Sequence, residues 1–227
     1  ERSTLSKMFQ YLVEARILDV NPARQVKNLS EKSGEREVYI SFSDFQEILK
    51  HLPHWFQAIA QTAFYTGMRR GEIVNLRRSS LDLDNRMIYL GPEDVKENRR
   101  KRVPIHLDLV PILENVLKIV PINHDLVFHN NGKQVNGNNQ LRWCWDRKVS
   151  KAGLNPCPRF HDLRHTWRTN ARRSGVDYQI AESILGHATR HKSSNTRYGR
   201  ISDSELLRAV DLMTFDHGTS EILVAQK

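Results

Sequence analysis

Apolar residues near the start of the chain recur at the spacing of one helix face. Between Thr4 and Leu18 the apolar positions are Leu5, Met8, Phe9, Leu12, Val13 and Ile17, and Asn21-Pro22 ends the run. This pattern predicts one amphipathic helix without companions. Residues 27–37 are polar, contain Gly34 and show no apolar periodicity, so we expect a linker that leads into a main domain near Val38.

The rest of the chain combines helical periodicity with a few short strand-like segments. Ser43 and Gln46 form a capping-box pattern at the start of one helix, and Gly67 is suited to end the next one. Helices are expected over residues 43–49, 54–66, 72–76, 108–119, 138–152, 161–174, 178–185 and 203–213. Strands are expected over residues 81–83, 87–90 and 103–105, with a further candidate over 126–128, and a charged turn over 96–102 forms the tip of the hairpin. The predicted fold class is mostly α with a small antiparallel β-sheet (α+β).

Composition restricts the class of partner. The 227 residues include 35 Lys and Arg against 26 Asp and Glu, a net charge of +9 with a sequence pI near 9.7, which favours a polyanion and above all nucleic acid. The two cysteines, Cys144 and Cys157, fit neither a disulfide framework nor a four-ligand zinc site, which indicates a reducing compartment. No apolar run reaches the length of a membrane span, so we expect a soluble protein, and the start at Glu1 indicates a fragment.

The positive charge is concentrated in the last third of the chain, together with a polar cluster. Residues 161–200 contain eight Lys and Arg against three acidic residues. On the expected helix, His161, Arg164 and His165 stand at i, i+3 and i+4 and can share one face, while Leu163, Trp167 and Ala171 can pack into a core. Taken alone, the same cluster also fits a helix-capping histidine beside a surface salt bridge.

A metal site is a second alternative for this cluster. His161 and His165 have the i, i+4 spacing of zinc-binding helices, but Asp162 stands where the metalloprotease motif has Glu, and Arg164 would place a positive charge beside the ion. Loss of activity with EDTA and recovery with zinc would favour this alternative. We expect neither a metal nor a cofactor.

Five short motifs in one order give the cluster a different meaning. They are Thr66-Gly67-Met68-Arg69-Arg70-Gly71-Glu72, Lys96 before Arg102-Val103-Pro104-Ile105, His161-Asp162-Leu163-Arg164, Leu185-Gly186-His187 and Thr196-Arg197-Tyr198. With them the chain resembles the tyrosine recombinase, or phage integrase, family over about residues 38–214. The resemblance implies the catalytic-domain fold of that family, with residues 1–35 as the last helix of a core-binding domain plus linker, 36–214 as the catalytic domain and 215–227 as a C-terminal tail.

The resemblance also implies six catalytic residues and one supporting residue. Arg69 and Arg164 match the paired arginines, Lys96 the hairpin lysine, His161 and His187 the histidines, and Tyr198 the nucleophile. Glu72 matches an acidic position that supports the first arginine, although it could equally be an ordinary carboxylate in the first turn of a helix.

Physical chemistry agrees with these roles. Two planar guanidiniums can bind the charge that develops on a phosphodiester through paired hydrogen bonds, without a metal. A tyrosine with an ordinary pKa of about 10 needs a base, for which His161 is the candidate, or a strongly positive site. Lys96 can protonate the departing 5′-oxygen and His187 can donate a hydrogen bond to the phosphate. Because four basic residues follow Lys96 in the same turn, a simple contact with the DNA backbone is its alternative role.

Further basic residues are candidates for contacts with DNA. They are Arg70, Arg99, Arg100, Lys101, Arg102, Arg168, Arg172, Arg190, Lys192 and Arg197. The spacing of eleven positions from His187 to Tyr198 is slightly longer than in the family pattern. This difference bears on the local geometry around Tyr198 more than on the identity of the tyrosine. The nearest rival nucleophile, Tyr178, begins a helix beside Ile180 and Ile184 and is interpreted as a packing residue.

The sequence therefore predicts a site-specific DNA recombinase of integrase type. It would cleave and rejoin DNA through a 3′-phosphotyrosyl intermediate, acting in the integration or excision of a mobile element. Its partner would be a double-stranded attachment site, and it would form a homo-oligomer, a tetramer on DNA, to which the tail can contribute by docking on a neighbour. If a phage or mobile element encodes it, the compartment is the cytoplasm of a bacterial host. A DNA-binding protein without catalysis and a type IB-like topoisomerase are the alternatives.

Overall fold

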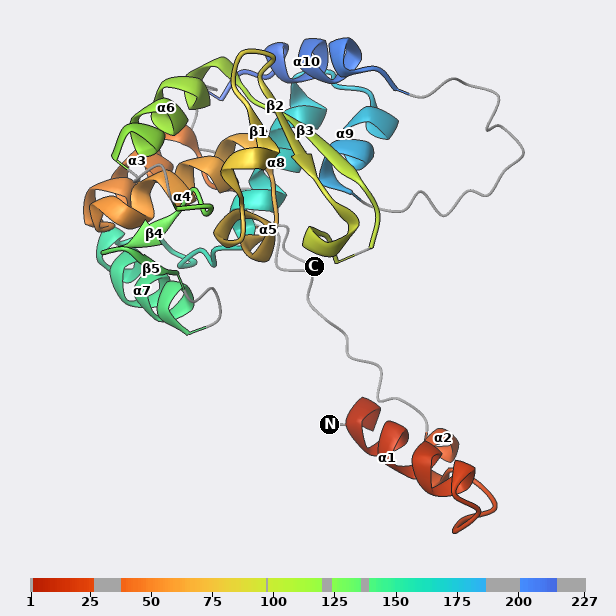
Figure 1. The fold of residues 1–227 in the computed structure, drawn as a ribbon. Helices are drawn as coiled ribbons and strands as arrows, with labels where there is room; N and C mark the ends of the chain where they lie inside the picture. Colours follow the sequence, from red (N-terminus) through yellow and green to blue (C-terminus); the bar gives the residue numbers. More distant parts are fainter. Residues whose placement is uncertain are drawn as a thin grey trace. The chain divides into compact units, whose positions relative to one another are not determined.

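The computed structural model describes residues 2–26, 38–96, 98–119, 124–135, 139–186 and 201–215 (Figure 1). Contacts divide the chain into two units, Glu1–Arg36 and Glu37–Lys227. No helix in the described ranges has both the length and the apolar character needed to cross a membrane. The expected linker, residues 27–37, lies outside the described residues.

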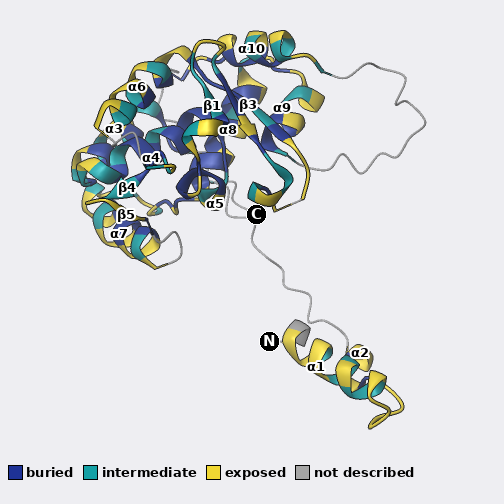
Figure 2. Cartoon of the chain, in the orientation of Figure 1, coloured by how far each residue is buried: buried dark blue, intermediate teal, exposed yellow. Residues whose placement is uncertain are grey.

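The first unit consists of two helices, α1 (Arg2–Glu14) and α2 (Pro22–Gln25). The predicted helix thus ends four residues before Leu18, and the prediction of a single helix is wrong. Asn21 explains the second helix, because its side chain accepts a hydrogen bond from the Ala23 amide at 3.1 Å and donates one to the Ser6 carbonyl at 2.8 Å. These contacts cap α2 and bind it to α1. Much of α1 is exposed (Figure 2). Its exposed residues include the apolar Leu5 and Met8.

The second unit is mostly helical with two small antiparallel sheets, as predicted. Its helices are α3 (Phe42–His51), α4 (His54–Thr66), α5 (Arg70–Val74), α6 (Val110–Ile119), α7 (Gln140–Val149), α8 (Asp162–Arg173), α9 (Tyr178–Leu185) and α10 (Asp203–Asp211). Short 3-10 turns are η1 (Arg78–Ser80), η2 (Pro92–Asp94), η3 (Leu107–Leu109) and η4 (Ser150–Ala152). The strands are β1 (Leu81–Asp82), β2 (Met87–Leu90), β3 (Lys101–Pro104), β4 (His129–Asn130) and β5 (Lys133–Gln134).

Three strands form the larger sheet, in the order β1-β2-β3, and both pairings are antiparallel. Ile88 lies opposite Leu81 on one side and Val103 on the other, and Leu90 lies opposite Lys101. The hairpin is therefore confirmed, but its second arm begins two residues earlier than predicted, at Lys101. The candidate strand over 126–128 is wrong: Leu126 forms only an isolated bridge with Arg77, and the strand there is β4, paired with β5.

The core of this unit lies between α4 and α8. Both helices carry many buried residues (Figure 2), including Phe64 on α4 and Leu163, Trp167 and Ala171 on α8. The apolar face predicted for α8 is thus confirmed. Figure 1 shows α9 and α10 beside the β2–β3 hairpin, and both helices contact β3. The described parts of the first four predicted motifs therefore lie on or beside α4–α5, β3, α8 and α9, elements that contact one another.

Local capping explains where two helices begin. Ser41, not Ser43, caps α3: its backbone is extended and its hydroxyl accepts the Asp44 amide at 3.1 Å, whereas Ser43 already lies in the first turn. Similarly, α5 begins at Arg70 rather than Glu72, because the Glu72 carboxylate accepts the Arg69 amide at 3.0 Å and so caps the helix from its third position.

Gly67 ends α4 as predicted, with φ of 64° in the left-handed region. Its lack of a side chain has a second function. A Cβ there would lie 2.9 Å from Leu185 Cδ2 and 3.0 Å from the Trp167 ring. Glycine at this position therefore lets the end of α4 approach α8 and α9 closely.

Candidate active site

The start of α8 presents two histidines to solvent and turns an arginine inward. His161 occupies the N-cap position, and its ring lies 4.8 Å from that of His165, nearly perpendicular to it. Both are exposed, whereas Arg164 is 5% exposed. The histidines thus share a face as expected, but the Arg164 side chain points away from it into the domain.

Two backbone carbonyls hold the Arg164 guanidinium. Nη1 donates to the Gly67 carbonyl at 2.7 Å, and Nη2 donates to the Leu185 carbonyl at 2.8 Å. These carbonyls lie at the C-terminal ends of α4 and α9, where the helix dipole favours positive charge. One turn further along α8, the Trp167 indole donates to the Tyr65 carbonyl at 3.0 Å. The arginine is therefore fixed by backbone from two other helices.

A buried carboxylate holds the second arginine. Arg69 Nη1 lies 3.1 Å from Glu72 Oε1, while the Arg69 amide binds Glu72 Oε2. The Glu72 side chain is only 2% exposed, against 21% for Arg69. Glu72 is thus both the cap of α5 and the partner of Arg69, a contact compatible with the supporting function that the family resemblance implies.

Lys101 is the residue that sequence reasoning misplaced. Its Nζ lies 2.7 Å from Glu72 Oε2, and both side chains are 2% exposed. The prediction that Lys101 contacts DNA is therefore wrong, because its charge is inside the domain. A signal was available: residues two apart in a strand share a face, so Lys101 lies on the same side as Val103, which is buried.

Shifts in pKa show that these groups act on one another. Loss of solvation, reinforced by the positive charges of His165, Arg164 and Arg69, lowers the pKa of His161, and Asp162 only partly opposes the shift. Loss of solvation also lowers the pKa of Lys101 to about 8; Glu72 opposes this shift, and Arg164 and Arg69 add to it. Both arginines thus lie within electrostatic range of His161 and Lys101. A neutral imidazole near two guanidiniums can accept a proton at neutral pH.

The remaining predicted catalytic residues are not part of this cluster in the described residues. Lys96 is exposed in the turn that follows η2, next to the buried Val95. His187 and Tyr198 lie outside the described residues, as do Arg190, Lys192 and Arg197.

The other candidate DNA contacts differ in their surroundings. Arg99, Arg100 and Arg172 are exposed, and Arg70 is partly buried. Arg102 is bound to Asp203 and to the Ile201 carbonyl, and Arg168 pairs with Glu182 at 2.9 Å. Tyr178 is not the packing residue that was expected: it is 64% exposed and its ring faces Arg168.

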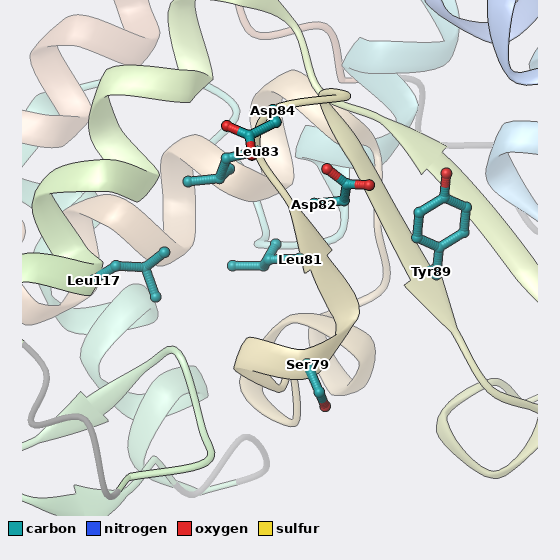
Figure 3. Close-up of a pocket in the computed structure, with 7 residues that line it drawn as sticks. All are labelled: Ser79, Leu81, Asp82, Leu83, Asp84, Tyr89 and Leu117. Atoms are coloured by element: carbon teal, nitrogen blue, oxygen red, sulfur yellow. The ribbon is translucent and has the colours of Figure 1, made fainter.

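Neither a metal cluster nor the pocket of Figure 3 competes with this site. Among the described residues, no group of three His, Cys, Asp or Glu side chains is placed to hold an ion. The pocket has a volume of about 510 Å³ and is lined by Ser79, Leu81, Asp82, Leu83, Asp84, Tyr89 and Leu117 (Figure 3). Its charged side chains are both carboxylates, which disfavour a phosphate.

Comparison with known proteins identifies the family. The model of the phage integrase family matches residues 35–205. The chain belongs to the phage integrase family. Members of this family, the tyrosine recombinases, are enzymes that break and rejoin DNA. The family resemblance seen in the sequence is thus confirmed.

Several relatives of this phage integrase family member span most of its length. A tyrosine recombinase of Thermosipho africanus is 27% identical over 216 residues, which cover 92% of this chain and 72% of the relative. A XerC-like tyrosine recombinase of Caldanaerobacter subterraneus is 23% identical, and the aligned region covers 92% of this chain and 63% of the relative. The integrase of Salmonella phage P22 is 23% identical, over 76% of this chain and 46% of the phage protein.

Solved structures confirm the fold of the phage integrase catalytic domain. The integrase of mycobacterium phage Brujita superposes with a TM-score of 0.64 at 20% identity, covering 95% of this chain and 71% of that one. A lambda integrase tetramer bound to a Holliday junction gives 0.64 at 20% identity, with coverages of 88% and 60%. At these identities the similarity concerns the fold alone.

Proposed function

We propose that this protein is a site-specific DNA recombinase that cleaves one strand at a time through a 3′-phosphotyrosyl intermediate formed by Tyr198. One observation carries the proposal. Arg69 and Arg164 come from distant parts of the chain, each is held by a buried partner, and both act electrostatically on His161. Such a pair of fixed guanidiniums suits a phosphodiester whose negative charge increases in the transition state.

The chemistry assigns each group one step. Arg69 and Arg164 bind the non-bridging oxygens, and His187 donates a further hydrogen bond to the phosphate. The Tyr198 oxygen attacks phosphorus as His161 takes its proton, and the bond to the 5′-oxygen breaks while Lys96 supplies a proton to that oxygen. Attack by a 5′-hydroxyl reverses these transfers and rejoins the strand. Glu72 keeps Arg69 in place throughout.

The partner in this proposal is a double-stranded attachment site. Exposed Arg99, Arg100 and Arg172, with Arg70, would contact phosphates, and Arg190, Lys192 and Arg197 would add to them. Arg102 and Arg168 can join only by exchanging their carboxylate partners for phosphates. His165, next to Arg164 in the chain, would support His161, whose ring it contacts.

Solved relatives support a proposal for assembly on DNA. Lambda integrase is seen as a dimer bound to a core site and as a tetramer bound to a Holliday junction, which supports a tetramer for this protein. The tail that would dock on a neighbour begins after Phe215, because Phe215 is 4% exposed and packs against Tyr65 and His106. An unchanged DNA-bound oligomer in sedimentation after removal of residues 216–227 would exclude docking by the tail.

Integration or excision of a mobile element is the role we favour, and a phage integrase is among the relatives. A XerC-like role is the second candidate, because several relatives carry that name. Strand transfer between two marked duplexes tests recombination in either role. A topoisomerase of the same chemistry would relax supercoiled DNA without such transfer.

Covalent trapping tests the nucleophile. The substrate is candidate attachment DNA with a nick beside the cleavage position. Cleavage should leave the wild-type protein attached to the 3′-phosphate of the cut strand, because the short fragment that carries the 5′-hydroxyl diffuses away and cannot rejoin it. Tyr198→Phe should form no adduct. Tyr178→Phe, the matched control on an exposed tyrosine, should form as much as the wild type. An adduct with Tyr198→Phe would refute the assignment, and no adduct with the wild type would favour a DNA-binding protein.

A further inference from the structure

We propose that Lys101 is a positioning residue that sets the placement of Arg69 relative to Arg164. The inference rests on the proposed function, in which these two arginines bind one phosphate. Lys101 lies on β3 between α5, which Arg69 precedes, and α9, whose end holds Arg164. Its ammonium binds Glu72 on α5 and its aliphatic stem lies against Gly186 at the end of α9, so a single buried side chain connects the two halves of the phosphate site.

The connection to Arg69 runs through the Glu72 carboxylate. Oε2 of Glu72 accepts the Lys101 ammonium at 2.7 Å and the Arg69 amide at 3.0 Å, while Oε1 takes the Arg69 guanidinium at 3.1 Å. A carboxylate with three such donors has one orientation. Lys101 thus determines which oxygen faces the guanidinium, and through it the direction of Arg69.

The connection to Arg164 runs through the end of α9. Gly186 caps α9 with φ of 75°, and a Cβ on it would lie 3.1 Å from Lys101 Cδ and 3.4 Å from Lys101 Cε. The backbone at the C-terminal end of α9 therefore lies close to the lysine stem. The residue before Gly186 is Leu185, whose carbonyl accepts Arg164 Nη2. The position of the Lys101 stem against Gly186 thus sets the position of the Leu185 carbonyl relative to Arg164.

The charge of Lys101 depends on a single partner in this surrounding. Among the described residues, the charged groups that act on it are Glu72 and Arg69 from the α5 segment and Arg164 from α8. Only Glu72 favours the ammonium, while burial and both arginines oppose it, which lowers its pKa to about 8. Below that pH Lys101 is charged and binds Glu72. Above it the neutral amine loses the attraction, and Glu72 is free to turn toward Arg69.

Lys101→Met tests the role, because methionine keeps most of the stem and removes the charge. We expect single-turnover cleavage of nicked DNA to fall by about 10²-fold, the size of effect that a displacement of about 1 Å can cause. The dissociation constant for the same DNA should change by less than about threefold, since Lys101 is buried and cannot contact DNA directly. Lys50→Met is the matched control: its Nζ lies 2.7 Å from Glu47 Oε2, but both side chains are exposed.

Dependence on pH separates positioning from a purely structural function. The wild-type rate should decline above about pH 8 as Lys101 loses its proton. Lys101→Arg keeps a charge that does not titrate, and if it cleaves it should lack that decline. Glu72→Gln combined with Lys101→Met should be no slower than the slower single variant, since the two act as one unit.

Three results would overturn the inference. The first is a cleavage rate of Lys101→Met equal to that of the wild type. The second is a cleavage rate of Lys101→Arg that declines above about pH 8 as the wild-type rate does. The third is a double variant, Lys101→Met with Glu72→Gln, whose loss of rate equals the two single losses combined. Should Lys101→Met not fold, the pH profile of Lys101→Arg decides. If the wild type itself forms no covalent adduct, the proposed function fails and the role of Lys101 fails with it. An adduct with the wild type and with Lys101→Met alike contradicts only the role of Lys101.

Discussion

Lys96 lies in the turn after η2 and Lys101, five residues later, begins β3, and the surroundings of the two lysines are opposite. Lys96 is exposed in the turn, while Lys101 is buried and paired with Glu72. The difference arises because β3 begins at Lys101, so that the alternation of the strand turns this side chain inward with Val103. A residue in the turn has no such constraint and remains available to a substrate.

The two lysines should therefore have different functions, although their side chains are chemically identical. A buried lysine that is already bound to a carboxylate is poorly placed to give a proton to a departing oxygen, but it can hold other groups in place. An exposed lysine contributes little to stability and can approach DNA. Rate and stability should therefore respond differently at the two positions.

The largest effect is expected from Lys96→Met on the rate of cleavage. Removal of a general acid typically costs about 10²–10⁴-fold, while the free energy of unfolding should change by less than about 0.5 kcal/mol at an exposed turn. Single-turnover kinetics and urea unfolding measure the two quantities.

A sulfur atom in place of the 5′-bridging oxygen sharpens this prediction. A thiolate leaves without a proton, because thiols have a pKa of about 8.5. The substitution should restore cleavage by Lys96→Met and leave Lys101→Met slow. Rescue of Lys101→Met instead would reverse the two assignments.

The next largest effect is the loss of stability in Lys101→Met. Removing one partner of a buried ion pair leaves the other charge poorly compensated, and we expect unfolding to become easier by about 3 kcal/mol, because Arg69 still binds Glu72. Lys50→Met should cost less than about 1 kcal/mol, since its pair is exposed. Equal losses in urea unfolding would mean that burial makes no difference between the pairs.

A smaller effect is expected at Gly67, on the other side of the Arg164 guanidinium. Gly67→Ala imposes a left-handed conformation on alanine and pushes against Leu185 and Trp167, which should cost about 1–3 kcal/mol. Cleavage should also slow, because the Gly67 carbonyl holds Arg164.

Gly153→Ala is the matched control for Gly67→Ala. Gly153 has φ of 69°, and no atom lies within 4 Å of an added Cβ. It should show the conformational cost alone and cleave normally. A slow Gly153 variant would mean that general destabilisation, not displacement of Arg164, explains the Gly67 result.

Patterns within short segments allowed much of the fold to be predicted. The bounds of α4 and α9, the left-handed Gly67, the β2–β3 pairing and the inner face of α8 follow from apolar spacing and turn residues. The errors arose where one short polar signal had rivals nearby. The sequence pattern predicts Ser43 as a cap, whereas Ser41 caps α3, and the run of basic residues before Arg102 concealed the start of β3.

The sequence by itself determined the family, the helical fold with its small sheet, and the identity of Arg69, His161 and Arg164 as candidates, because ordered motifs and local periodicity are properties of the chain alone. Only the tertiary structure decided what holds them. Arg164 binds carbonyls of Gly67 and Leu185, and Lys101 binds Glu72 across 29 positions. Such contacts depend on how distant segments pack, and a buried polar group takes whichever partner that packing places beside it.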